Sequence, residues 1–95
     1  MSARIEIGES SVPRLPRHVK LRYDETRRQW VMLAPERVFL PDDIALEILR
    51  LCDGVASVGA IVDTLAAKFA TPRVEIADDV REMLQDLADK GMVVA

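Results

Sequence analysis

The spacing of apolar and polar side chains changes near the middle of the chain. Before that point, residues 18–24 alternate with a period of two, residues 30–34 are wholly apolar, and residues 38–40 form a third, very short apolar run. Alternation is typical of a half-buried strand, and a run that is apolar on both faces is typical of a central strand. The pattern predicts three antiparallel strands in chain order, with residues 30–34 in the middle.

Beyond residue 41 the apolar side chains recur every three or four residues, which predicts helices with one buried face. The three apolar stripes are Ile44, Ile48, Leu49 and Cys52; Val58, Ile61, Val62, Leu65 and Phe69; and Ile76, Val80, Met83, Leu84 and Leu87. The expected N-caps of the three helices are Asp42, Ser57 and Thr71, with Pro72 at the first helical position of the third. Gly54 is expected past the end of the first helix and Gly91 past the end of the third.

Together these elements predict an α+β fold, in which an N-terminal three-stranded antiparallel sheet is followed by three helices. The last two helices and the segment after Lys90 have the look of a winged helix-turn-helix, with residues 92–94 as a short extended tail. Residues 1–16 are rich in Ser, Gly and Pro and are expected to form a flexible arm. Residues 17–95 then form a single domain.

Size and composition favour a binding module over an enzyme. The chain has 95 residues, one cysteine (Cys52) and one histidine (His18), which excludes an internal disulfide and leaves no basis for a histidine-rich metal site or a His-based triad. Cys52 is expected to be a buried structural thiol, and Trp30 is expected in the core. No apolar run reaches the ~20 residues that span a bilayer, and no signal-peptide stretch opens the chain, so we expect a cytoplasmic protein.

Charge is distributed unevenly along the chain. Residues 1–41 carry eight Lys or Arg and five Asp or Glu, whereas residues 42–95 carry five and eleven. In the expected last helix, residues 74–90, six acidic side chains oppose Arg81 and Lys90. Binding to nucleic acid depends largely on cations that neutralise phosphates. The helix that would enter a DNA groove has a negative net charge, which disfavours DNA binding.

The third strand, residues 38–40, is the informative feature of the predicted sheet. Both outer strands have one open edge, and Lys20 and Arg22 guard the edge of the first in the way exposed edges are usually protected. The third strand carries no charge of its own, so it is a template on which another strand can add. Cover by a helix, by the N-terminal arm or by a second copy of the chain remains an open alternative.

Several segments, taken in order, resemble the PqqD family of pyrroloquinoline quinone (PQQ) biosynthesis. They are Pro13-Arg14-Leu15, residues 19–23, residues 30–33, Pro35-Glu36, the Leu-Cys-Asp-Gly block within residues 48–54, and residues 80–92. The resemblance implies a non-catalytic peptide chaperone that binds the precursor peptide PqqA and presents it to PqqE, a radical S-adenosylmethionine enzyme. It also implies that the peptide adds to the third strand and lies against the third helix. The peptide-binding residues would then be Arg37, Val38, Phe39, Leu40, Ile76, Val80, Arg81 and Leu84, with no catalytic residue, cofactor or metal.

Three alternatives accompany that interpretation. The first is a small protein that binds or carries PQQ or a quinone intermediate, although the sequence shows no convergent polar groups that would build a pocket. The second is a winged-helix DNA-binding protein, which the acidic last helix disfavours. The third concerns assembly, because the unguarded strand and the N-terminal arm leave open a homodimer formed by strand exchange.

Overall fold

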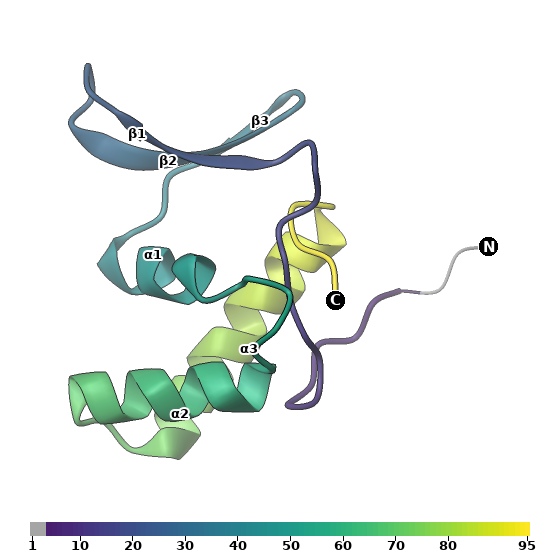
Figure 1. Cartoon of the computed structure of the whole chain (residues 1–95), viewed down its shortest axis with the longest axis vertical. Coiled ribbons are helices and arrows are strands. Elements are labelled where there is room, and N and C mark those ends of the chain that lie inside the picture. The colour runs from purple at the N-terminus through teal and green to yellow at the C-terminus, as the bar shows by residue number, and fades with distance from the viewer. Residues whose placement is uncertain (1–3) are drawn as a thin grey trace.

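The computed structural model of the protein describes residues 4–95. The elements, in chain order, are β1 (Lys20–Asp24), β2 (Gln29–Ala34), β3 (Arg37–Phe39), α1 (Asp43–Arg50), α2 (Val58–Phe69) and α3 (Arg73–Asp89). The sheet lies over α1, and α2 and α3 pack together beyond it (Figure 1). The predicted α+β fold, a three-stranded antiparallel sheet followed by three helices, is confirmed.

The sheet has the predicted strand order, with β2 between β1 and β3. Met32 at the centre of β2 pairs with Leu21 on one side and Phe39 on the other. The loop between β2 and β3 is only two residues long, and its second residue, Glu36, has a φ of 61°. A proline followed by a residue with positive φ is the signature of a type II turn. The first strand starts two residues later than predicted, and the third ends at Phe39, so Leu40 lies outside the ladder.

Two of the three predicted helix starts are confirmed. The Asp42 carboxylate accepts the backbone N–H of Ala45 at 2.8 Å, and the Ser57 hydroxyl accepts that of Ala60 at 3.1 Å. Both bonds satisfy donors that a helix start leaves without a partner.

The prediction for the third helix start is wrong. Pro72, not Thr71, is the N-cap of α3, and no side chain caps this end. The cause is Ala70, whose left-handed conformation (φ 50°) ends α2. The chain turns there, and the Thr71 hydroxyl donates back to the carbonyl of Phe69 instead of facing α3.

The core lies between the sheet and the helices and contains most of the predicted stripes. Its largest fully buried side chains include Met32, Ile48, Leu49, Ile61, Leu65, Leu84 and Leu87. Three stripe residues differ from the prediction: Ile44 is 48% exposed in the first turn of α1, Phe69 is 39% exposed at the last residue of α2, and Met83 in α3 is only partly buried. Met83 lies at the margin of the core. Ile44 and Phe69 stand at helix ends, where the neighbouring elements no longer cover the stripe.

Trp30 and Cys52 complete the comparison with the expected core. Trp30 is only half-buried: its ring makes an edge contact with Tyr23, with centroids 5.7 Å apart, and the Arg50 guanidinium lies 4.8 Å from its centroid. Cys52 is buried as expected, and its thiol donates to the carbonyl of Ile48 at 3.3 Å. Burial raises the pKa of the Cys52 thiol to about 12, so the reactive thiolate is nearly absent at neutral pH.

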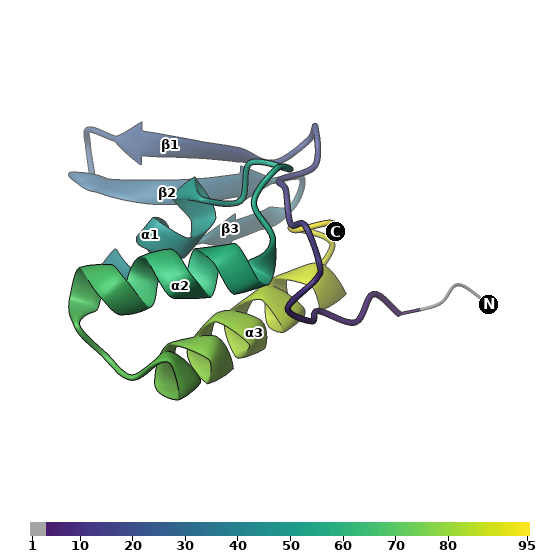
Figure 2. The same ribbon diagram turned by 60° about the horizontal axis from the view of Figure 1, so that its bottom comes forward.

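The segment before the sheet lies against the helices and the C-terminal tail (Figure 2). Arg14 and Val94 exchange two backbone hydrogen bonds, of 2.8 and 3.0 Å. The carbonyls of Glu9 and Ser11 accept N–H groups from the first turn of α2. The flexible arm predicted for residues 1–16 stays a prediction, and residues 1–3 of it lie outside the described residues. Within residues 4–95, no helix is both long and apolar enough to cross a membrane.

Candidate binding groove beside the sheet edge

The backbone of β3 has one side without a strand partner in the described part of the chain. The two-residue loop is closed by the pair Ala34–Arg37, and hydrogen-bonded pairs alternate along antiparallel strands. Arg37 and Phe39 therefore direct their backbone groups at β2. Val38, between them, directs its N–H and C=O to the open side. The register thus identifies the one residue of β3 whose backbone is free to pair with another strand.

A hollow of about 370 Å3 lies between β3, α1 and α3. Its lining residues are Phe39, Leu40, Asp42, Ile44, Ala45, Ile48, Asp79 and Met83. A shallower hollow continues along α3, between Asp79, Glu82, Met83 and Asp86. We call these two hollows together the groove. Its floor is apolar, and half-exposed Leu40 and Ile44 stand at its rim.

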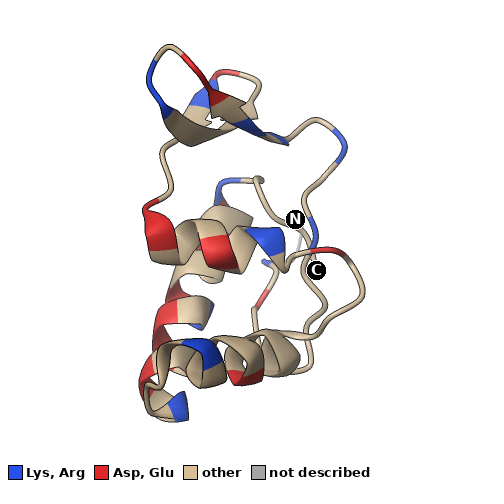
Figure 3. Ribbon diagram, turned by 60° about the vertical axis from the view of Figure 1, so that its left-hand side comes forward, with Lys and Arg blue, Asp and Glu red and all other residues tan. Residues whose placement is uncertain are grey.

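The wall that α3 contributes to the groove is acidic. Figure 3 shows acidic positions at the start of α1 and along α3, whereas basic positions are spread over the sheet, the helices and the segment before the sheet. Asp86 is paired with Lys90 at 2.8 Å, on the same helix. Asp79 and Glu82 have no ion pair within residues 4–95. The groove therefore combines an apolar floor with uncompensated negative charge.

The structure divides the eight residues proposed from the sequence into two sets. Phe39 and Leu40 line the groove, next to the free backbone of Val38. Ile76, Val80 and Leu84 are buried in the core and do not line it. Arg81 is exposed and pairs with Asp78 at 3.0 Å, away from the lining residues. Arg37 is an exposed residue at the start of β3.

The reason is the geometry of α3. A helix turns by about 100° per residue, so the core stripe through Val80 and Leu84 is followed around the helix by a second face that carries Asp79, Met83 and Asp86. That second face lines the groove. Asp79, Met83 and Ile44 are the residues that the sequence analysis missed. The available signal was the three- and four-residue spacing of Asp79, Met83 and Asp86 beside the stripe.

The side chain of Val38 faces a different hollow. It is 60% exposed and lines a space of about 330 Å3 on the face of the sheet that carries Arg22, Val31 and Leu33. Its neighbour Phe39 faces the helices, because successive side chains of a strand point to opposite faces. A strand added at this edge would therefore find apolar surface on both faces of the sheet.

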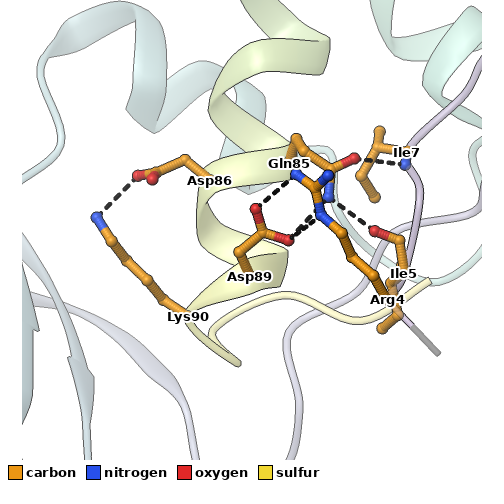
Figure 4. Close-up of polar contacts among 7 residues, drawn as sticks. All are labelled: Arg4, Ile5, Ile7, Gln85, Asp86, Asp89 and Lys90. Atoms are coloured by element: carbon orange, nitrogen blue, oxygen red, sulfur yellow. Dashed lines mark hydrogen bonds and ion pairs between the residues drawn. The ribbon is translucent and has the colours of Figure 1, made fainter. Parts of the chain in front are cut away.

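Outside the groove, another part of the α3 surface is covered by the chain's own N-terminal segment (Figure 4). The Gln85 amide accepts the backbone N–H of Ile7 at 2.9 Å and donates to the carbonyl of Ile5 at 2.7 Å. Arg4 donates two hydrogen bonds, of 2.9 and 2.8 Å, to the Asp89 carboxylate. This ion pair holds the pKa of Asp89 below its usual value.

Farther along the N-terminal segment, the Glu9 carboxylate accepts two hydrogen bonds, of 2.7 and 2.9 Å, from Arg73 at the start of α3. Arg73 also donates to Asp63 of α2 at 2.6 Å. The contact with Arg73 lowers the pKa of Glu9. The segment is thus held by ion pairs at both ends and by a side-chain amide between them.

The fold and the groove define a small α+β domain of the winged-helix type with an open strand edge. A family model described as "Coenzyme PQQ synthesis protein D (PqqD)" matches residues 29–93. With two thirds of the chain matched and relatives above 60% identity, the chain belongs to the PqqD family.

Individual relatives agree with this assignment. A protein from Rhodopseudomonas palustris strain HaA2, named "PqqA binding protein", is 64% identical, and the match covers 97% of this chain and 90% of the relative. A solution structure of the PqqD part of Methylobacterium extorquens PqqCD is 42% identical, covers 94% of this chain and 95% of that one, and has a TM-score of 0.80; it is described as a stand-alone RiPP recognition element. A crystal structure of PqqD from Xanthomonas campestris is 43% identical over 94% of this chain and 99% of that one, with a TM-score of 0.61.

Proposed function

We propose that this chain is a non-catalytic chaperone of PQQ biosynthesis that binds the precursor peptide PqqA as an added strand on β3 and presents it to the radical S-adenosylmethionine enzyme PqqE. The observation that carries the proposal is the free backbone of Val38 beside the apolar groove. Backbone hydrogen bonds at an open edge hold a peptide of varied sequence, and the flanking pockets add specificity. Relatives named as PqqA binding proteins support the identity of the peptide.

The test uses proline at the edge. Val38→Pro removes the outward N–H and leaves the ladder to β2 intact, whereas Phe39→Pro removes an N–H that pairs with β2. Val38→Ala is the matched control, because it shortens the same side chain but keeps the N–H. A net hydrogen bond contributes about 0.5–1.5 kcal/mol, so Val38→Pro should bind PqqA roughly threefold to tenfold more weakly than Val38→Ala.

The readout is a titration of isotope-labelled protein with PqqA, followed by NMR. Wild-type shifts should concentrate on β3, the start of α1 and the groove face of α3, and free PQQ should not reproduce them. Phe39→Pro should lower the melting temperature instead. Strand addition is contradicted when folded Val38→Pro binds as tightly as Val38→Ala and the shifts fall away from β3.

Presentation to PqqE makes a separate demand on the complex. Adding PqqE to labelled protein that already holds PqqA should leave the groove shifts in place and create new ones on another surface. Release of PqqA from the groove on addition of PqqE would contradict presentation, while leaving peptide binding intact.

The open edge also bears on the oligomeric state. A second copy paired at β3 by strand exchange would occupy the backbone of Val38, so homodimer formation through this edge and PqqA binding exclude one another. Sedimentation at increasing protein concentration, with and without PqqA, measures this competition. A dimer that persists with PqqA bound would have to use another surface.

A further inference from the structure

The acidic wall of the groove points to a property of the peptide that the groove accepts. Three of the acidic side chains on α3 have a cationic partner from this chain: Asp78 pairs with Arg81, Asp86 with Lys90, and Asp89 with Arg4. Asp79 and Glu82, which line the groove, have none within the part of the chain that the structure describes. Glu75, at the start of α3 and outside the groove, is also unpaired within residues 4–95, but Asp79 lines the same hollow as Phe39 and Leu40, so uncompensated charge borders the open edge of β3.

The arrangement has a cost in the empty groove. Asp79 and Glu82 are three residues apart on α3, a spacing that places like charges side by side and destabilises a helix. A cation between them would remove that repulsion. The chain's own cations nearby do not do so: Arg73 and Arg81 on α3 are paired with Glu9, Asp63 and Asp78, and Lys90 at its C-cap is paired with Asp86.

We infer that the groove selects an extended peptide segment in which an apolar residue and a Lys or Arg stand two positions apart. The inference rests on the proposed function, because it assumes that the peptide pairs with β3. Side chains two positions apart point to the same face of a strand and are about 7 Å apart. The apolar one packs on the floor between Phe39, Ile44 and Met83, and the cation lies against Asp79 and Glu82.

The dimensions agree with this assignment. Asp79 and Met83 are four residues apart on α3, a rise of about 6 Å, close to the spacing of alternate strand residues. The long aliphatic stem of Lys or Arg packs along apolar surface while its charged end reaches a polar rim. A peptide with an acidic residue at that position would place a third negative charge beside Asp79 and Glu82 and is disfavoured.

The experiment compares two double variants of the full chain. Asp79→Asn with Glu82→Gln removes the charge from the groove wall and keeps similar side-chain shapes. Glu6→Gln with Glu75→Gln removes the same charge from two exposed residues that line neither the groove nor the hollow at Val38 and have no ion pair within residues 4–95. Binding of fluorescently labelled PqqA is measured for each at low and high salt.

The groove variant should bind PqqA about twofold to tenfold more weakly at low salt, since exposed ion pairs contribute modestly, and its affinity should depend less on salt. The outer variant should bind as the parent does. A PqqA in which each Lys and Arg is replaced by Gln should bind the parent more weakly, and the groove variant should then cause little further loss, as expected for residues that interact directly.

Three outcomes would overturn the inference. The groove variant could bind PqqA unchanged or more tightly, or both double variants could weaken binding equally, which would indicate a general field of the whole protein. In each case the parent still binds PqqA, so strand addition at β3 survives. Failure of the parent chain itself to bind PqqA would instead refute the proposed function.

Discussion

Two neighbouring parts of the exposed surface of α3 carry acidic side chains and differ in what lies against them. On one side, Gln85 and Asp89 are engaged by the backbone of Ile5 and Ile7 and by the Arg4 guanidinium. On the other, Asp79 and Glu82 face the groove with no ion pair within residues 4–95. The first side shows what a satisfied contact between this helix and an extended segment requires. The second has the same kinds of groups and lacks the segment.

The difference shows which element supplies the hydrogen-bonding groups for the backbone of an extended segment in each place. On the covered side, the Gln85 amide supplies one donor and one acceptor, as a residue of a neighbouring strand would. On the groove side, none of the lining residues of α3 has a side-chain amide. The donor and acceptor there are the backbone N–H and C=O of Val38 in β3. The helix there contributes only apolar surface and charge. The groove therefore needs both elements, whereas side chains of α3 alone make the hydrogen bonds to Arg4, Ile5 and Ile7.

The largest expected effect separates the core stripe of α3 from its groove face. Leu84→Ala should cost about 2–5 kcal/mol of unfolding free energy, because it empties a fully buried site. Met83→Ala, one residue away but only partly buried and lining the groove, should cost about 1 kcal/mol or less and should weaken PqqA binding. Urea unfolding and peptide titration measure the two effects. Should Leu84→Ala fail to fold, Leu84→Val replaces it and should leave PqqA affinity unchanged; a folded Leu84 variant that weakens PqqA binding as much as Met83→Ala would contradict the assignment of faces.

An intermediate effect is expected on the covered side. Gln85→Ala removes both backbone contacts, so the Ile7 amide should exchange its hydrogen faster, with a loss of stability of about 1–2 kcal/mol. Gln85→Glu is the matched control, because its carboxylate still accepts from Ile7 but cannot donate to Ile5. PqqA affinity should not change in either variant. Peptide binding that weakens with Gln85→Ala would show that the two sides of α3 are coupled.

The smallest effect is a pH dependence confined to the covered side. The pKa values of Asp89 and Glu9 are lowered from 3.8 and 4.5 by their arginine partners. For a carboxylate with a lowered pKa, the stabilisation is complete above the ordinary value and is lost as the pH falls through the folded one. The Ile5 and Ile7 amide signals should therefore begin to shift only below about pH 4. Arg4→Gln should move the Asp89 part of the transition to higher pH, and an unmoved transition would show that the ion pair is not formed in solution.

The strands and two helix starts were predictable because their causes are local. Alternation within residues 18–24 and the short polar side chains of Asp42 and Ser57 act on their immediate neighbours. The start of α3 was not predictable in this way, because it depends on the left-handed backbone of Ala70. Alanine gives no signal for that conformation, which a glycine or asparagine would have given.

Only the strand side of the candidate groove was predictable from the sequence, because the helix side depends on long-range packing. Its strand side follows from sequence order, since β3 is the last of three strands and so has an open edge. Its helix side depends on how α3 is rotated against the sheet, which long-range packing sets. Periodicity alone identified the apolar stripe of Val80 and Leu84, and that stripe is the core. The exposed apolar residue in the first turn of α1, Ile44, is the feature that now shows where the groove runs.

The pairing of Arg14 with Val94 has a consequence for how this domain can be combined with other proteins. It brings the leading and trailing segments together, and the described N-terminal segment (purple) and the C-terminus lie on the same side of the molecule, whereas the start of α1, which lines the groove, lies on the opposite side (Figures 1 and 2). Genetic fusion at either end would add its tether on that shared side. The domain is thus built as a module that can be appended without obstructing its groove.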